Sequence, residues 1–300
     1  VVSFLDSDYD VAVDTAGGKA YIVNYVSSRI VRMNLDGTNA ENLGDLGGLV
    51  NWPRGIALDV AAGKMYITNA GNYVIIQANL DGTGAVNLGD LNGTLSQPSG
   101  IALDIAAGKM YVTNTFNNTI SRANLDGTGG VSLGNLGGTL NQPFGLALDT
   151  ANDKMYVTNA GNETVTRANL DGTGGTNMGN PGGLVGNIFR IALNAGACPA
   201  FVPTPTPTLP ETPTITPTPT NPPTLAPTVP PSAMCLYVAN YGSRTVARAN
   251  WDVSGAENLG GSSGSLDQPY GIALDLTAGK MVVTNYDLSL IHISEPTRPY

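Results

Sequence analysis

The stretch Gly18-Lys19-Ala20-Tyr21-Ile22-Val23-Asn24 recurs along this chain at a constant spacing of 45 residues. Its lysine returns as Lys64, Lys109 and Lys154, each time followed by an apolar-rich run that ends in asparagine. A fixed period of this length is the signature of a repeated supersecondary unit rather than of one irregular domain. The repeat therefore decides the fold, and it says much less about the function.

Each period contains four short segments with the composition of β-strands. In the third period they are residues 99–104, 109–114, 119–125 and 131–134. They are rich in β-branched residues, and the Asp126-Gly127 pair between the last two is a strong hairpin signal. No segment shows the helical spacing of apolar residues over ten or more positions. We therefore predict an all-β fold in which each repeat forms one four-stranded antiparallel sheet.

Four strands in 45 residues match the size of one β-propeller blade. The segments 111–114, 122–128 and 143–149 resemble the YWTD repeat of the LDL-receptor class B modules and the related YVTN and NHL repeats. In the second strand, Ile or Val replaces the tryptophan of that family and Asn replaces its aspartate, which is closer to the bacterial surface YVTN type. The resemblance covers nearly all of residues 1–198 and 235–288.

The resemblance implies a β-propeller that is six-bladed when complete, with seven blades as the alternative. The repeats on both sides of an interruption amount to about five and a half blades. We therefore expect the propeller to be incomplete in this fragment and the ring to stay open.

A tract rich in proline and threonine interrupts the array. Residues 199–234 hold 13 of the 20 prolines of the chain, and such a composition cannot build a packed core. We expect an extended, disordered linker or stalk. Two arrangements remain open. Either the tract is a loop inserted into one ring, or it joins two propellers, of which residues 1–198 end the first and residues 235–288 start the second.

Two cysteines, Cys198 and Cys235, flank this tract. They would pair with each other in the one-ring arrangement and with cysteines outside the chain in the other. The alternative is two unrelated thiols. Cysteines that bracket a Pro/Thr stalk indicate an oxidising compartment, so we expect an extracellular or cell-surface protein of bacterial type. The chain begins with Val1, and we expect it to be a fragment that does not contain an export signal.

The array stops abruptly after residue 288. Residues 289–300 resemble a translated sequencing adapter, with Leu288 ambiguous and a divergent native tail as the alternative. This segment contains His292, the only histidine of the chain. If the segment is not native, the rest of the fragment has no histidine, which excludes histidine-dependent catalysis and histidine-bound metal there.

Composition excludes several classes of partner. The formal net charge is -9, only 12% of residues are charged, and there is no basic run. We therefore expect no nucleic-acid partner. No apolar stretch approaches the length of a membrane span. The chain also has no phosphate-binding loop, no Cys-x-x-Cys pair and no nucleophile elbow.

One face of the predicted ring varies from repeat to repeat. Strand direction alternates, so the loops that enter the first strand and those that follow the second strand share this face, while the turns of the opposite face are nearly identical. Variable positions on a constant scaffold are free to carry recognition, and aromatic residues and arginine are common at binding surfaces. Neutral variation over packed aromatic rings is the alternative. The candidate binding residues are Tyr9, Tyr25, Arg54, Phe144, Phe189, Tyr241 and Tyr270.

A set of aspartates ends the first strand of the repeats. One interpretation is a calcium site near the channel, and the other is a turn in which each carboxylate binds its own backbone. We favour the turn, and so expect no cofactor, with calcium as the alternative. The aspartates are Asp14, Asp59, Asp104, Asp149 and Asp275.

Together these observations favour a non-catalytic secreted or cell-surface module. It would recognise a protein, peptide or glycan through the variable face, or serve as a structural scaffold. The alternative is a propeller-type lyase or lactonase-like hydrolase with a metal at the channel mouth. A catalytic propeller needs unique polar residues that break the repeat near the axis, whereas the first strands here look nearly invariant.

Overall fold

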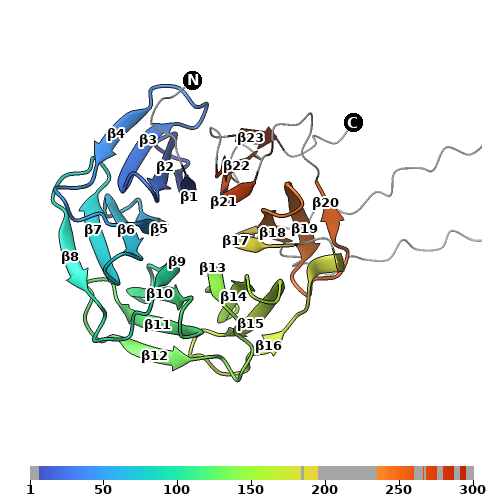
Figure 1. The fold of residues 1–300 in the computed structure, drawn as a ribbon. Coiled ribbons are helices and arrows are strands. Elements are labelled where there is room, and N and C mark those ends of the chain that lie inside the picture. The colour runs from blue at the N-terminus through green and yellow to red at the C-terminus, as the bar shows by residue number, and fades with distance from the viewer. Residues whose placement is uncertain are drawn as a thin grey trace, which may run out of the picture.

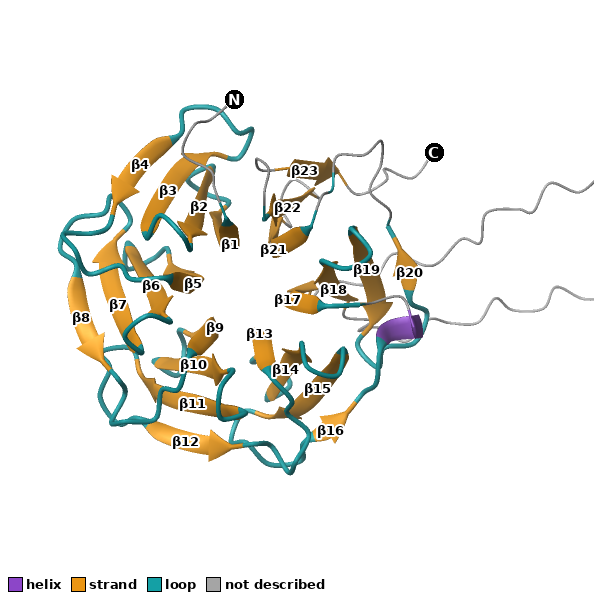
Figure 2. Ribbon diagram, in the orientation of Figure 1, coloured by secondary structure: helices purple, strands orange, loops and turns teal. Residues whose placement is uncertain are grey.

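The computed structural model describes residues 7–183, 186–194, 235–259, 266, 268–275, 280–286 and 291–294. These residues form six antiparallel sheets around a common axis (Figure 1). Five sheets have four strands and the sixth has three. The fold is a β-propeller, as the 45-residue period predicts. We number the blades 1 to 6 in chain order and name the strands of each blade inner, second, third and outer from the axis outward (Figure 2).

The strands of the first three blades follow one pattern. Blade 1 consists of β1 (Asp8–Asp14), β2 (Lys19–Asn24), β3 (Arg29–Asn34) and β4 (Glu41–Gly44). Blade 2 consists of β5 (Pro53–Asp59), β6 (Lys64–Asn69), β7 (Val74–Asn79) and β8 (Val86–Gly89). Blade 3 consists of β9 (Pro98–Asp104), β10 (Lys109–Asn114), β11 (Thr119–Asn124) and β12 (Val131–Gly134).

The remaining blades repeat the pattern with shorter outer strands. Blade 4 consists of β13 (Pro143–Asp149), β14 (Lys154–Asn159), β15 (Thr164–Asn169) and β16 (Thr176–Asn177), and the 3-10 helix η1 (Pro181–Gly183) follows it. Blade 5 consists of β17 (Ile188–Asn194), β18 (Cys235–Asn240), β19 (Thr245–Asn250) and β20 (Glu257–Asn258). Blade 6 consists of β21 (Pro269–Asp275), β22 (Lys280–Asn285) and β23 (Ile291–Ser294).

Local sequence sets the strand limits closely. In blade 3 the observed strands differ from the predicted ones only because β9 begins one residue earlier, at Pro98, and β11 ends one residue earlier, at Asn124. Within the described residues, no helix is long and apolar enough to span a membrane.

The hydrophobic core lies between the blades. Each blade packs one face on the preceding blade and the other on the following blade, so the second strand is buried on both sides. This explains why the second strand reads as an almost continuous apolar run. Between blades 3 and 4, for example, Tyr111 and Ile120 pack in one cluster with Leu146, Met155 and Val157.

The ring closes between blade 6 and blade 1. Strand β1 lies beside β21, and Val11, Ile22 and Val31 of blade 1 form one buried cluster with Ala273 and Val282 of blade 6. Blade 6 is incomplete in the described part of the chain, as expected, because it has three strands. The expectation of an open ring is wrong, since these three strands already reach blade 1. Strand β23 lies within the segment that we expected to be non-native.

The strands on the two sides of the Pro/Thr tract are neighbours in one sheet. β17 pairs antiparallel with β18, with Ile191 opposite Val238. The chain therefore re-enters blade 5 after the tract. Residues 199–234 and Cys198 lie outside the described residues. Cys235, the first residue of β18, is buried and disulfide-bonded.

A threonine–glycine contact joins successive blades near the axis. In blade 4, the hydroxyl of Thr158 accepts a hydrogen bond from Gly145 N at 2.8 Å and donates one to the carbonyl of Phe189 in blade 5 at 2.8 Å. A Cβ atom on Gly145 would lie 2.6 Å from that carbonyl oxygen, so glycine is required where the inner strands converge. The same two hydrogen bonds occur at Thr68 and Thr113 of blades 2 and 3.

Asparagines fix the loops of the variable face. The side chain of Asn114, at the end of β10, accepts a hydrogen bond from Ser96 N at 2.9 Å, and Asn159 accepts one from Asn141 N at 3.0 Å. In each case the donor belongs to the loop that enters the same blade from the preceding one. We call this side of the ring the loop face and the opposite side the turn face.

Replacing Thr158 by valine tests the threonine–glycine contact. Thr158→Val keeps the shape but leaves Gly145 N and the Phe189 carbonyl without their partner, so the unfolding free energy should fall by about 1–3 kcal/mol. Denaturant unfolding measures this loss. Thr176→Val, on the exposed outer strand β16, is the control and should stay within about 0.5 kcal/mol of the parent. Equal stability of the two variants would contradict the role of the contact.

Candidate functional site

The inner strands bring the variable residues of the loop face together at the axis. One position, directly before the glycine of the inner strand, carries a different kind of side chain in different blades. The aromatic side chains at this position and those of the adjoining loops meet in a single group of rings. We call this group the aromatic cluster. Its members are Tyr9, Tyr25, Trp52, Phe144, Phe189, Tyr241, Tyr270 and Tyr286.

Tyr270 lies at the centre of the cluster. Its ring centroid is 4.3 Å from that of Tyr9, and it stacks on Phe189 at 4.2 Å with an interplanar angle of 11°. Phe144 meets it edge-on at 5.6 Å. Tyr270 is 5% exposed, and burial raises the pKa of its hydroxyl well above the usual value of 10.0. Burial also raises the pKa of Tyr9. The centre of the cluster is thus dry and tightly packed.

Arg54 lies against the same rings. Its guanidinium carbon is 5.5 Å from the ring centre of Tyr25, 5.8 Å from that of Phe144 and 6.0 Å from that of Tyr9, within the range of cation–π attraction. The ring of Trp52 is 5.9 Å from that of Tyr25, and Trp52 is 52% exposed. The edge of the cluster around these residues is therefore accessible, in contrast to its centre.

All seven candidate binding residues from the sequence belong to this one assembly, six as rings and Arg54 as the cation against them. Trp52 and Tyr286 also belong to the cluster and are not among the seven. Tyr286 follows the asparagine that ends its second strand, as Tyr25 and Tyr241 do, and Trp52 directly precedes Pro53 in a variable loop. Aligning the repeats by these neighbours gives the signal that finds both.

A buried ion pair lies next to the cluster, and the sequence analysis missed it. Arg190 of β17 and Asp10 of β1 stand where the other four blades have the inner-strand glycine. Arg190 Nε is 3.3 Å from Asp10 Oδ1, and both residues are buried. The threonine that contacts this glycine is also replaced in these two blades, by Val23 and Ala239. Two linked departures from the repeat are the sequence signal for the pair.

Groups from several blades bind the pair, and Arg190 Nε has no hydrogen-bond acceptor. Arg190 Nη1 donates to the carbonyl of Phe144 at 3.2 Å, and Nη2 donates to the carbonyl of Arg54. Asp10 Oδ2 accepts from Ile56 N at 3.1 Å. Burial raises the pKa of Asp10 and lowers that of Arg190, and the opposite charge of each partner counteracts the effect of burial. The two groups also line a cavity of about 100 Å³ between the inner strands. We infer that the pair closes the channel below the aromatic cluster.

The aspartates that end the inner strands belong to turns. Asp14 accepts from Gly17 N at 2.8 Å, Asp59 from Ala62 N at 3.0 Å and Asp104 from Ala107 N at 3.0 Å. Asp149 does the same with Asn152, and Asp275, on the same face, lies opposite Lys280. In the described ranges, no three His, Cys, Asp or Glu side chains are grouped so as to hold a metal ion.

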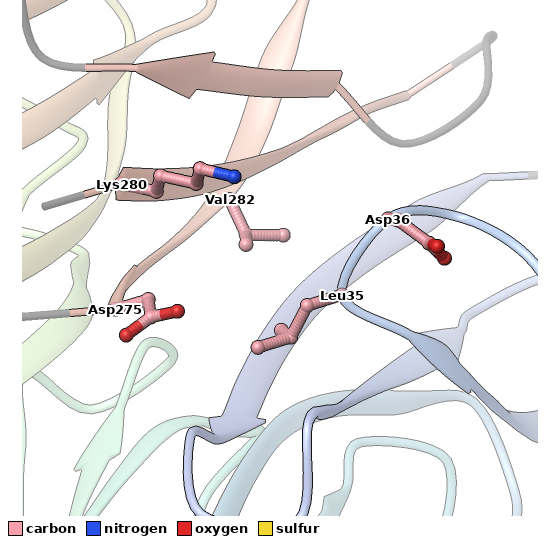
Figure 3. Close-up of a pocket in the computed structure, with 5 residues that line it drawn as sticks. All are labelled: Leu35, Asp36, Asp275, Lys280 and Val282. Carbon is pink, nitrogen blue, oxygen red and sulfur yellow. The ribbon is translucent and has the colours of Figure 1, made fainter. Parts of the chain in front are cut away.

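The turn face has a pocket of about 400 Å³ between blades 6 and 1 (Figure 3). Leu35 and Asp36 line it from blade 1, and Asp275, Lys280 and Val282 from blade 6. Between blades 1 and 2 the residue equivalent to Leu35 is Leu80. It packs against the same hydrophobic cluster as Leu43 and Leu49 of blade 1.

Comparison with solved structures shows similarity of fold. A gluconolactonase, XC5397 from Xanthomonas campestris, is 14% identical with a TM-score of 0.66, covering 94% of this chain and 84% of its own. A chain of a nidogen/laminin complex is 19% identical with a TM-score of 0.59, at 84% and 78% coverage. Virginiamycin B lyase from Staphylococcus aureus is 15% identical with a TM-score of 0.58, at 99% and 87% coverage. The chain matches no family model and no curated protein. The fold is thus shared with binding proteins and with enzymes.

A double-mutant cycle tests the buried pair. Asp10→Gly leaves the Arg190 charge buried without its partner, and Arg190→Gly does the same to Asp10. Each variant should lose about 3–5 kcal/mol of unfolding free energy. The double variant carries the glycines of the other four blades and should lose clearly less than the sum of the two single losses. Denaturant unfolding of the four proteins gives the comparison. Strictly additive losses would show that the two charges do not interact.

The buried tyrosines predict sensitivity to alkali. The raised pKa of Tyr270 means that the unfolded chain loses this proton first. The stabilisation from the protonated, buried hydroxyl is therefore complete below the ordinary tyrosine pKa. Above that pKa, the unfolding free energy falls by about 1.4 kcal/mol per pH unit for each such hydroxyl. Unfolding free energies between pH 9 and 11 measure the slope. Tyr270→Phe should reduce the slope relative to the parent protein. An unchanged slope in Tyr270→Phe would rule out the assignment.

Proposed function

We propose that this propeller is a non-catalytic binding module that recognises a ligand of protein, peptide or glycan class through its loop face. The observation that carries the proposal is the aromatic cluster, whose edge is accessible at Trp52 and Tyr25 while its centre is packed. A rigid aromatic surface with an arginine against it has the composition of binding hot spots. Its position above a closed channel favours a ligand that lies on the ring.

Exposed apolar side chains extend the accessible edge over the same face. Val26, Tyr73 and Phe116 stand in the loops that follow the second strands of blades 1, 2 and 3. Phe116 is 77% exposed. Exposed apolar side chains on several neighbouring blades of one face are compatible with an interaction surface there. The binding surface would therefore cover the axis and blades 1 to 3.

The axis gives little support to the enzyme alternative. Asp10 and Arg190 do break the repeat there, as a catalytic propeller would require. However, each is engaged by the other and by backbone groups, so neither is placed to act as a base or an acid. No metal or other cofactor is part of the proposal, and calcium bound at the turn-face aspartates remains the alternative.

An extracellular or cell-surface location fits this function. Disulfides persist in oxidising compartments, and Cys235 is disulfide-bonded. In the proposal, the Pro/Thr tract between β17 and β18 serves as a solvated spacer.

The two tryptophans of the chain provide a matched test. Trp52 is 52% exposed on the loop face, and Trp251 is 40% exposed in a turn of the opposite face. On immobilised panels of glycans, peptides and extracellular proteins, Trp52→Ala should weaken binding by about tenfold or more, while Trp251→Ala should not. Equal effects would contradict recognition by the loop face. Metal-dependent turnover of a lactone or a streptogramin by the parent would favour the enzyme instead.

A further inference from the structure

Arg54 has no anionic partner among the described residues. Its guanidinium contacts aromatic rings, and its Nε atom is buried without a hydrogen-bond acceptor. The two carboxylates of β1 at this end of the ring are engaged elsewhere. Asp10 pairs with Arg190, and Asp8 accepts a hydrogen bond from Asn24 at 2.8 Å. No carboxylate of the described residues therefore neutralises this guanidinium, which is the charge that an incoming anion would meet.

The chain as a whole is acidic, so an arginine without a carboxylate partner is a local departure from its overall charge. The chain has 23 acidic and 14 basic residues and a formal net charge of -9. An arginine without a carboxylate at the centre of the loop face therefore does not follow from a basic composition. In an acidic protein, a ligand carboxylate gains affinity only where a local cation overcomes the general repulsion.

Flat apolar surface lies directly beside this cation. The Tyr25 ring is 5.5 Å from the Arg54 guanidinium, and the Trp52 ring is 5.9 Å from Tyr25 and half exposed. An aromatic face of this kind packs against another flat, partly apolar surface while the polar edge of that partner stays in water. The C–H face of a pyranose ring is such a surface.

The site offers no edge for an added peptide strand. The second strand of each blade covers one edge of its inner strand, and the other edge faces the axis. The Asp10–Arg190 pair, which lines a cavity of about 100 Å³, and the aromatic cluster lie there. Recognition of a peptide by strand addition needs an open edge. A peptide strand therefore cannot be added to an inner strand here, and the surface offers a ligand ring faces and a charged group instead.

We propose that the edge of the aromatic cluster binds an acidic saccharide. The carboxylate of a uronic acid residue pairs with Arg54, and its pyranose ring stacks on Tyr25 and Trp52. An arginine can give two parallel hydrogen bonds to one carboxylate, which fixes orientation as well as charge. This inference rests on the proposed binding function and names the ligand class.

Calorimetric titration with a short galacturonate oligomer and with its methyl ester tests the charge. The ester keeps the sugar rings and removes the negative charge. The acid should bind, the ester should bind at least about tenfold more weakly, and added salt should weaken only the acid. Equal affinity for the two would overturn the pairing with Arg54, even if both bind.

Substitutions at Arg54 locate the contact. Serine occupies the equivalent position in blade 3, as Ser99, so the scaffold accommodates Arg54→Ser. This variant should lose about tenfold or more in affinity for the acid, and Arg54→Lys should lose less because it keeps the charge. Arg167→Ser removes the same charge beside Trp251 on the turn face and should leave affinity unchanged. Unaltered binding by Arg54→Ser would overturn the proposal.

Two further outcomes separate this inference from the proposed function. If no uronate binds while another probe is captured in a Trp52-dependent manner, the saccharide assignment fails and the binding function stands. If an Asp/Glu-rich peptide replaces the uronate as the Arg54-dependent ligand, the ligand is an acidic peptide and the saccharide assignment is wrong. If no probe shows dependence on Trp52, the binding function itself fails.

Discussion

The structure depends on the close approach of inner strands at the axis. In blades 2, 3 and 4 the approach is so tight that a Cβ atom on the inner-strand glycine would meet a carbonyl of the next blade. One threonine hydroxyl per blade then satisfies both the glycine N–H and that carbonyl. This contact fixes the distance between neighbouring blades and so the positions of the loops that each inner strand carries. In blades 2, 3 and 4 the glycine and the threonine of this contact recur every 45 residues, which is the period seen in the sequence.

This contact is absent from two blades, where a buried ion pair takes its place. In blades 1 and 5 the glycines become Asp10 and Arg190, and the threonines become Val23 and Ala239. Charge pairing replaces the hydroxyl bridge, and Arg190 reaches backbone carbonyls of blades 2 and 4. The residues directly before these positions, Tyr9 and Phe189, are two of the eight rings of the aromatic cluster. The same convergence thus explains the closed channel and the dense ring packing on the loop face.

Much of the fold could be predicted from the sequence, because hairpin turns and strand alternation are local. The β10 strand lies at the predicted residues for this reason. The seven candidate residues were found because they vary on a constant scaffold. Closure at β1 and β21 was missed because it depends on how far three strands reach in space. The Asp10–Arg190 pair was missed because its partners lie 180 residues apart, and only the axis of a closed ring brings them together.

Solvent exchange of the Arg190 guanidinium protons tests the account most directly. It can be followed by NMR on protein labelled with ¹⁵N-arginine, with Arg190→Lys providing the assignment. The account predicts that the Arg190 Nε–H exchanges far more slowly than the guanidinium protons of exposed arginines, because the ion pair is buried in a closed channel. Exchange of Arg190 as fast as that of an exposed arginine would mean a hydrated, open channel and would contradict the account.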